Sequence, residues 1–393
     1  MATPSLKWNV VANYIGSFYG TALGIIMVPI YLKYLGRESY GLVGFYAVLS
    51  GWLQLLDMGL SGSLVRETAS YRGGTIDRST LMRMVHALEG VFLAVGTSVA
   101  ALVALFSGKI ASHWLKADSL SHQDLSLAVA SMGVIFALNW QMGIRKSVLI
   151  GLEKQVYVNV LNVFFATVNN FGVLLVFHYV EATIVVYFYF RLFVAFLVMI
   201  AYYLVVQALL PCDSHERSWS LEPLKRIWRF SLSIAITSSI WVFVTQTDKL
   251  ILSTVLSLSD YAGFSIAVTV AGAVALMTGP MAVGTQPRLA QMYSAGDETG
   301  LRRLYSDTTQ VLAGVAWPTA VIMALSAHPI LLAWTRDLVI ADKACFTMSL
   351  YALGNGITAV GAVTYYLQFA KADLSLHLKG TIGLGFIQIP VVV

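Results

Sequence analysis

The chain has 393 residues, of which 58% are hydrophobic and only 11% are charged, and its mean hydropathy is +0.74. Soluble domains carry about 25% charged residues, so this composition excludes an ordinary soluble enzyme or binding module. The net charge of +5 reflects membrane topology, because loops rich in Lys and Arg stay cytoplasmic, and it does not indicate nucleic-acid binding.

Long apolar runs recur along the whole chain, which predicts an all-α polytopic membrane protein. The first run, Trp8–Leu32, is too long for the apolar core of a signal peptide and lacks a small-residue cleavage site, so we interpret it as a retained span. An eleventh run, 380–393, stops short of a full span. The ten predicted spans are 8–32, 40–64, 84–107, 125–144, 156–178, 182–210, 230–252, 261–286, 308–334 and 344–369.

The loop charges predict the orientation and the division into lobes. Most of the 25 Lys and Arg residues fall on the cytoplasmic side if the N-terminus is cytoplasmic. The most polar cytoplasmic connection, Pro211–Arg229, divides the chain into an N-terminal six-helix lobe at 1–210, a linker at 211–229 and a C-terminal lobe at 230–393. Because Val393 ends inside an apolar run, we expect the second lobe to be incomplete, in a fragment or a natural truncation.

An internal repeat links the two predicted lobes. Sliding the chain against itself by 222 positions aligns polar residues and glycines at corresponding helix ends without a gap. Six predicted spans precede the second copy, so the two copies share one orientation and form a parallel repeat about an axis along the membrane normal. The matched pairs are Gly41 with Gly263, Gly62 with Gly284, Arg66 with Arg288, Tyr71 with Tyr293, and Gly74 with Gly296.

Three stretches carry a resemblance to a known family. PIYLKYLGRESYG at Pro29–Gly41, followed by LLDMGLSGSLVRE, resembles the first two helices of bacterial polysaccharide-repeat-unit flippases, the Wzx type. GIRKSVLIGLEKQVYVN at Gly143–Asn159 is similar to the family's loop between helices four and five. TQTDKLILSTVLSLSDYAG at Thr245–Gly263, followed by Gln286-Pro287-Arg288, is the third match.

This resemblance implies a fold and a function. The fold is a MATE-like transporter of two six-helix bundles (6+6) with alternating access, of which about 10–11 spans are present here. The function is movement of an undecaprenyl-pyrophosphate-linked oligosaccharide across the bacterial cytoplasmic (inner) membrane for surface polysaccharide synthesis. The implied partners are this lipid-linked glycan, membrane lipids, and a polysaccharide polymerase with chain-length proteins; no nucleic acid is expected.

No enzymatic motif is present in the sequence. There is no phosphate-binding Gly-x-x-x-x-Gly-Lys-Ser/Thr sequence, no nucleophile elbow and no zinc-ligand cluster, and Cys212 and Cys345 form no motif spacing. We therefore expect no catalysis, no cofactor and no metal site, and transport driven by an ion gradient or by the substrate's own gradient.

Four basic residues are candidate substrate ligands. Arg191 lies in the middle of an apolar span, where a guanidinium suits a pyrophosphate or an acidic sugar; a lipid-facing arginine that reaches the interface is the alternative. Arg66 and Arg288, equivalent in the repeat, are expected at the cytoplasmic mouth, where they would bind pyrophosphate or simply anchor the topology. Lys249 is a candidate on the outward side, or part of an interfacial ion pair.

Three acidic residues are candidates for ion coupling. Asp57 and Glu89 lie in predicted spans, where burial favours the protonated form; a neutral, hydrogen-bonded structural acid is the alternative for each. Asp248 adjoins Lys249 near the outer end of span seven.

Other functions remain open at this point. A cation-coupled multidrug exporter of the MATE type often carries an acid on helix one or on helices seven and ten. Predicted spans one and ten contain no acid, and Arg191 favours an anionic cargo. A lipid II flippase and a non-transporting membrane scaffold are the further alternatives.

Overall fold

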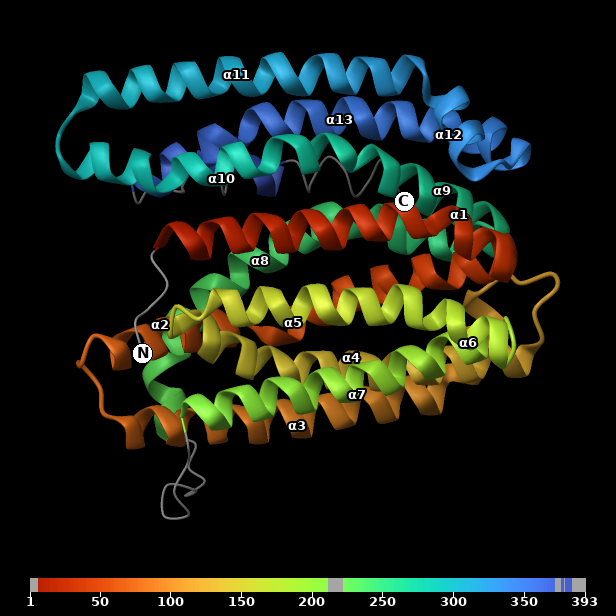
Figure 1. Ribbon diagram of the computed structural model, residues 1–393, viewed down its shortest axis with the longest axis horizontal. Helices are drawn as coiled ribbons and strands as arrows, with labels where there is room; N and C mark the ends of the chain where they lie inside the picture. The colour runs from red at the N-terminus through yellow and green to blue at the C-terminus, as the bar shows by residue number, and fades with distance from the viewer. Residues whose placement is uncertain (1–5, 211–221, 372–375, 378, 384–393) are drawn as a thin grey trace. The chain divides into compact units, whose positions relative to one another are not determined.

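All elements in the described part of the chain are helices. The computed structural model describes residues 6–210, 222–371, 376–377 and 379–383 (Figure 1). Eight helical stretches within these residues are long and apolar enough to cross a membrane. Each of the ten predicted spans falls on one helix or on consecutive helical segments, which confirms the polytopic all-α class. Helices dominate because hydrocarbon offers no partner for backbone N–H and C=O groups.

Contacts divide the chain into two units. The first comprises Met1–Gly24 with Phe45–Val255, and the second comprises Ile25–Gly44 with Leu256–Val393. The predicted lobe boundary was placed at 211–229, before the helix that these contacts group with the first unit. Residues 211–221 of that predicted linker lie outside the described residues, and the predicted lobes stay a prediction.

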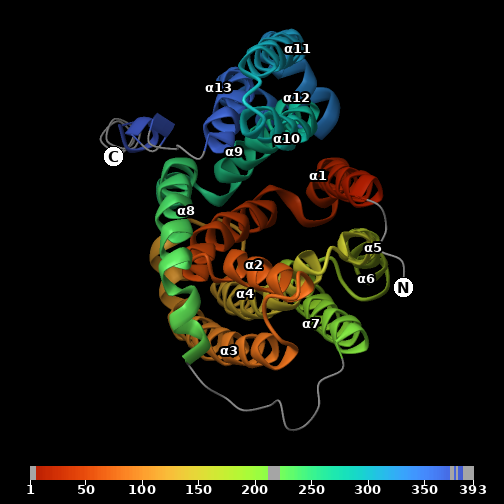
Figure 2. The same ribbon diagram turned by 90° about the vertical axis from the view of Figure 1, so that its left-hand side faces the viewer.

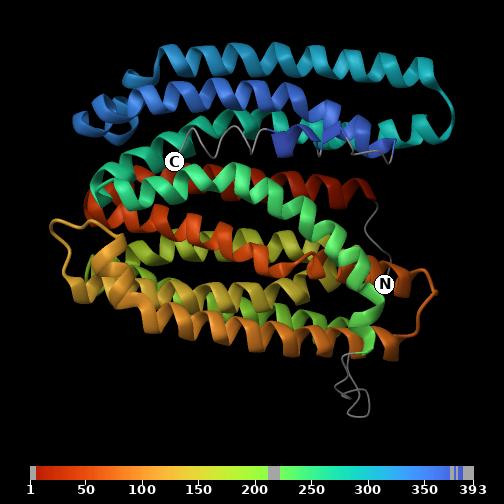
Figure 3. The same cartoon turned by 180° about the vertical axis from the view of Figure 1, so that it is seen from behind.

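The first unit is a bundle in which α3, α4 and α7 lie side by side, and α2 also packs on α4 (Figures 1 and 2). α8 packs against α2 and α3 (Figure 3). Its core joins apolar side chains of α2, α3, α4 and α7, including Leu64, Phe92 and Tyr202. The elements are α1 (Leu6–Leu53, shared with the second unit), η1 (Gln54–Asp57), α2 (Leu60–Arg72), α3 (Arg78–Lys109), η2 (Ile110–Trp114), α4 (His122–Gly151), α5 (Gln155–Thr167), η3 (Val168–Gly172), α6 (Val173–Tyr179), α7 (Ile184–Leu209) and α8 (Glu222–Val255).

The second unit is built around α13 (Leu338–Ala370). This helix contacts each of the four helices that precede it in the unit, α9 to α12. Its small core includes Leu289, Leu312 and Val363, all fully buried. Figure 1 shows α11 and α13 running alongside each other. The helices are α9 (Leu258–Ala271), α10 (Ala273–Ser294), α11 (Glu298–Leu325), α12 (Ala327–Thr335) and α13 (Leu338–Ala370).

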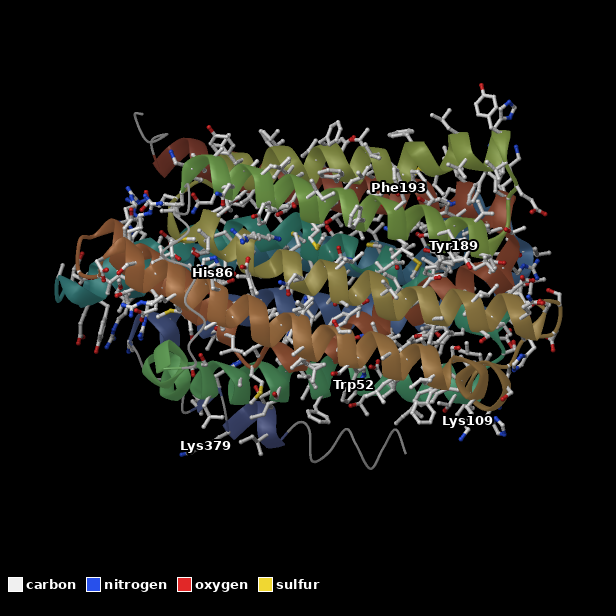
Figure 4. The ribbon with its side chains drawn as sticks, turned by 90° about the horizontal axis from the view of Figure 1, so that it is seen from below. Trp52, His86, Lys109, Tyr189, Phe193 and Lys379 are labelled. Atoms are coloured by element: carbon white, nitrogen blue, oxygen red, sulfur yellow. The ribbon has the colours of Figure 1, made fainter. Side chains whose placement is uncertain are left out.

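Large apolar side chains cover the outside of the helices. Tyr189 and Phe193 project from α7 (Figure 4), with 47% and 58% of their surface exposed. Leu105 of α3 and Leu325 of α11 are exposed by 78% and 83%. Such continuous apolar exposure is unusual for a soluble protein, whereas in a bilayer these side chains meet lipid tails.

The predicted repeat is visible in a duplicated turn. α2 and α10 end at Arg72 and Ser294, which are 222 positions apart, and each is followed by a glycine with positive φ, Gly74 at 75° and Gly296 at 70°. The Gly74 N–H donates to the Tyr71 carbonyl at 3.0 Å, and the Gly296 N–H donates to the carbonyl of the equivalent tyrosine at 3.1 Å. Both turns need a residue that tolerates the left-handed region, and glycine does so without a Cβ clash.

An aspartate begins the helix after each of these turns. The Asp77 carboxylate accepts the Thr80 N–H at 3.3 Å at the start of α3, and Asp297 accepts the Gly300 N–H at 2.8 Å at the start of α11. Hydrogen bonds from the Ser79 hydroxyl and from Thr80 lower the pKa of Asp77 to about 2. Asp77 is therefore ionised at physiological pH, and its charge complements the positive end of the α3 dipole.

The first family-like motif marks a bend in α1. Gly36 has φ 80° and ψ 171°, so two helices meet there without a loop. Arg37 follows directly, and its guanidinium forms a two-point ion pair with Asp337, with Nη2 at 2.8 Å from Oδ1. Asp337 also accepts the Val339 N–H at 3.0 Å at the start of α13. The Gly-Arg pair thus fixes the bend to the beginning of α13, within the second unit.

Candidate substrate cavity and the buried charges around it

The LLDMGLSGSLVRE part of the first family-like stretch forms a helix break, where the sequence predicted one continuous span over 40–64. After α1 ends at Leu53, the chain makes one 3-10 turn to Asp57 and then places Met58 and Gly59 in the left-handed region, at φ 46° and 70°. The Ser61 N–H and hydroxyl both donate to the Asp57 carboxylate, the N–H at 3.3 Å. Asp57 therefore caps the first turn of α2, where a helix N-terminus favours a negative charge.

A cavity of about 450 Å³ opens beside this break, inside the first unit. This volume is within the roughly 300–1,000 Å³ of small-molecule sites. Its walls come from the end of α1, from the break itself, from one face of α4 and from α8. The lining residues are Tyr46, Ser50, Gln54, Leu55, Asp57, Met58, Gly59, Ser61, Gly62, Phe136, Asn139, Trp140, Gly143, Ala235, Ser239 and Val242.

The lining combines hydrogen-bonding groups with aromatic rings. Serine hydroxyls, the amides of Gln54 and Asn139 and the Asp57 carboxylate supply the polar groups, and among the described lining residues Asp57 alone is charged. Trp140 is stacked on Phe92 with ring centroids 4.2 Å apart, which holds its indole in place. Two buried polar atoms of the lining, Ser50 Oγ and Trp140 Nε1, have no hydrogen-bond partner within the described structure. Such atoms are costly when they are buried without a partner.

A buried ion pair that the sequence did not reveal joins α3 and α4, the two helices that also supply the stacked rings of Phe92 and Trp140. The Arg145 guanidinium of α4 pairs with the Glu89 carboxylate of α3, and their side chains are only 8% and 20% exposed. Arg145 also lies over the Tyr203 ring of α7, with its guanidinium carbon 4.7 Å from the centroid. The loop expected to contain Arg145 is shorter than predicted, because α4 continues to Gly151. Glu89, proposed for ion coupling, therefore has a cationic partner.

Arg66 and Arg288 occupy equivalent places near the ends of α2 and α10. Arg66 is half-exposed, and its Nη2 lies 2.8 Å from the carboxylate of Glu67, which is 2% exposed. Arg288 is exposed. Both arginines have exposed surface, which a residue that binds an anionic ligand requires.

Arg191 does not line the cavity. Its Nη1 donates to the Tyr187 hydroxyl at 2.7 Å, one turn earlier on α7, and its guanidinium carbon is 5.3 Å from the centre of the same ring. Tyr187 is 1% exposed, and the neighbouring Phe188 makes an edge contact with Tyr46 of the cavity wall, at 5.8 Å between centroids. Aromatic neighbours thus connect Arg191 to the cavity wall.

Lys249 and Asp248 lie close together, but they are less exposed than the interfacial pair expected as the alternative to a ligand role. Lys249 Nζ lies 3.9 Å from Asp248 Oδ1, and both side chains are about one-fifth exposed. The ammonium also donates to the Thr245 carbonyl, one turn earlier on α8. Neither side chain lines the cavity.

Of the seven predicted site residues, the structure places only Asp57 on the cavity. Ser50, Asn139 and Trp140 lie there too, and one signal for them was available, since polar residues within apolar spans are costly unless they are used. In the described part of the chain no cluster of three His, Cys, Asp or Glu side chains could hold a metal ion. Cys212 lies outside the described residues.

Comparison with solved structures shows the fold. An inward-facing multidrug resistance MATE family transporter of the MOP superfamily is 15% identical to this chain, with a TM-score of 0.74 over 94% of this chain and 84% of that one. The lipid II flippase MurJ in an inward closed conformation is 12% identical, with a TM-score of 0.71 over 95% and 78%. Such low identities establish the MATE-like transporter fold and not the cargo.

Comparison with curated sequences and families narrows the relationship. The "Putative O-antigen transporter" of Shigella flexneri is 27% identical over 156 residues, which make up 40% of this chain and 36% of the relative. The match thus spans little more than a third of that relative's length. The family profile described as "Polysaccharide biosynthesis protein" matches residues 6–293. Since this match covers well over half of the sequence, the chain belongs to the polysaccharide biosynthesis protein family, within a transporter fold shared with MATE exporters and MurJ.

Proposed function

We propose that the protein is a flippase that moves undecaprenyl-pyrophosphate-linked oligosaccharides from the cytoplasmic to the periplasmic leaflet of the bacterial inner membrane by alternating access. The observation that carries this proposal is the cavity of about 450 Å³ at the Asp57 helix break, which combines hydroxyl, amide and aromatic groups. A polar cavity at membrane depth suits a hydrophilic glycan that must cross hydrocarbon. Family membership and the O-antigen transporter relative support the same cargo.

The basic residues complete the proposed path. Arg66 and Arg288 would hold the pyrophosphate at the cytoplasmic side, because a guanidinium binds phosphate oxygens at two points. Arg191 and Lys249 are secondary candidates, since each already engages a neighbour on its own helix. The N-terminus would be cytoplasmic, and a polysaccharide polymerase with chain-length proteins would act on the product.

Reconstitution tests this function. Purified protein in liposomes should expose a polyprenyl-pyrophosphate-linked disaccharide to a membrane-impermeant oxidant at least about tenfold faster than protein-free liposomes. Arg66→Ala and Arg288→Ala together should lower the rate, while Arg303→Ala, an exposed arginine of α11, should not. A rate no higher than that of protein-free liposomes, at every imposed ion gradient, would rule the flippase out.

One observation favours a second function, a cation-coupled multidrug exporter. Asp57 is the charged residue of the described cavity lining, and a carboxylate attracts a cationic drug as well as a sugar. Ethidium efflux from cells expressing the protein distinguishes the two. Efflux that an Asp57→Asn substitution abolishes, without any glycolipid movement, would identify an exporter.

A further inference from the structure

We propose that the cavity of the first unit selects the sugar and rejects negative charge, with Asp57 as the specificity-determining residue. This inference rests on the proposed flippase function and specifies the chemistry of its cargo. The ligand would be a neutral or amino-bearing sugar of the glycan, and the pyrophosphate and acidic sugars such as uronic acids would be excluded from the cavity.

The first argument is electrostatic. Asp57 faces a cavity whose described lining contains no Lys or Arg. With Asp57 ionised, a second anion beside it would meet a like charge in surroundings that screen poorly, and like charges placed together repel. The Arg145 guanidinium does not offset this repulsion, because it is paired with the Glu89 carboxylate and does not line the cavity.

The second argument concerns hydrogen bonds. A sugar hydroxyl both donates and accepts, and the lining offers partners for both roles: amides, serine hydroxyls and a carboxylate. The bonds from Ser61 use only part of the acceptor capacity of Asp57. A ligand rich in hydroxyls would therefore meet both donors and acceptors in the lining.

The third argument is shape and rigidity. Tyr46, Phe136 and Trp140 bring three rings to the wall, and the apolar face of a pyranose can pack on such a surface. Phe136 and Trp140 are themselves stacked, with centroids 5.9 Å apart and planes inclined by 21°. The wall is therefore ordered before any ligand arrives, which lowers the entropic cost of binding.

The test uses three matched lipids: polyprenyl pyrophosphate carrying glucose, glucosamine or glucuronic acid. These sugars share one ring and differ in charge. Liposomes containing the full chain are treated with periodate, which does not cross the membrane, and mass spectrometry follows the oxidation of each lipid. We expect the glucose and glucosamine lipids to flip at least roughly tenfold faster than the glucuronic acid lipid.

Asp57→Asn is the decisive variant. It keeps an acceptor for the Ser61 N–H, so the helix cap is preserved, but it removes the charge. We expect the ratio between the glucose and glucuronic acid lipids to fall to within about twofold, with glucose transport changed by no more than about threefold. Asp307→Asn, the matched control, removes the charge of an exposed carboxylate on α11, away from the cavity lining, and should keep the wild-type ratio. Equal rates for all three lipids in the wild type, or an unchanged ratio in Asp57→Asn, would overturn the inference.

A binding measurement separates this inference from the proposed function. The affinity of each lipid for the detergent-solubilised protein is followed by thermal shift. If no lipid is flipped but the glucose and glucosamine lipids still bind in preference to the acidic one, and Asp57→Asn removes that preference, the flippase proposal fails and the cavity inference stands. If none of the lipids binds, both fail.

Discussion

The buried pair of Glu89 and Arg145 gives the sharpest prediction about stability. Replacing Arg145 by Met leaves a carboxylate that is four-fifths buried without its cation, and replacing Glu89 by Met leaves a guanidinium that is 8% exposed without its anion. Breaking a buried pair on one side costs about 3–5 kcal/mol. The arginine variant also loses the contact with the Tyr203 ring, about 1–2 kcal/mol in a desolvated site.

The double variant should be far more stable than the two single changes imply. With both charges gone, two methionines fill the space between α3 and α4, and such replacements of buried pairs are often close to neutral. We therefore expect a coupling energy of at least about 3 kcal/mol in a double-mutant cycle. The free energy of unfolding is measured by titration with sodium dodecyl sulfate in mixed micelles.

An exposed pair provides the control for this cycle. Arg303 and Asp307 lie one turn apart on α11, with 3.8 Å between Nε and Oδ2 and side chains 85% and 63% exposed. Their coupling should not exceed about 0.5 kcal/mol. A coupling below about 1 kcal/mol for the buried pair, or equal to that of the exposed pair, would refute the reasoning that burial makes this interaction strong.

Two further predictions concern glycines and are read from thermal unfolding midpoints in detergent. Gly41→Ala should lower the free energy of unfolding by about 1–3 kcal/mol, because its Cβ would collide with a backbone carbonyl of α9. Gly20→Ala, the control, has open space around it and should be neutral or slightly stabilising. Equal unfolding midpoints for the two variants would contradict the close approach of Gly41 to α9. Gly74→Ala and Gly296→Ala should each cost about 1–2 kcal/mol from strain at positive φ. Gly73→Ala, at φ −75°, should leave the unfolding midpoint unchanged. An equal fall in the midpoint for this variant would show that strain at positive φ is not the cause.

Much of the fold was readable from the sequence because a bilayer leaves few choices. Apolar runs must become helices, since hydrocarbon satisfies no backbone group, and the predicted spans fall on helical segments accordingly. The repeat was readable because local turn chemistry follows local sequence: Gly74 and Gly296 adopt the same conformation for the same steric reason. The break at Asp57 was not predicted, because the sequence analysis placed Asp57 inside one continuous span over 40–64.

The site depended on partners that the chain brings from far away. Arg145 looked like a topological loop charge, and only the packing of α3 and α7 against α4 makes it the partner of Glu89 and Tyr203. Arg191 looked like a ligand for an anionic cargo, yet its guanidinium donates to the Tyr187 hydroxyl on its own helix and does not line the cavity.

By itself, then, the sequence indicated a helical membrane transporter with a parallel repeat and acidic residues within its spans. Only the tertiary structure shows a break at Asp57 that borders a cavity, because a cavity exists only where separate helices leave space between them. Asp57 carries its carboxyl group in any fold, but α4 and α8 supply the amide, the indole and the hydroxyl that surround it. Hydropathy reports the cost of placing a side chain in hydrocarbon, whereas the identity of its neighbours depends on long-range packing.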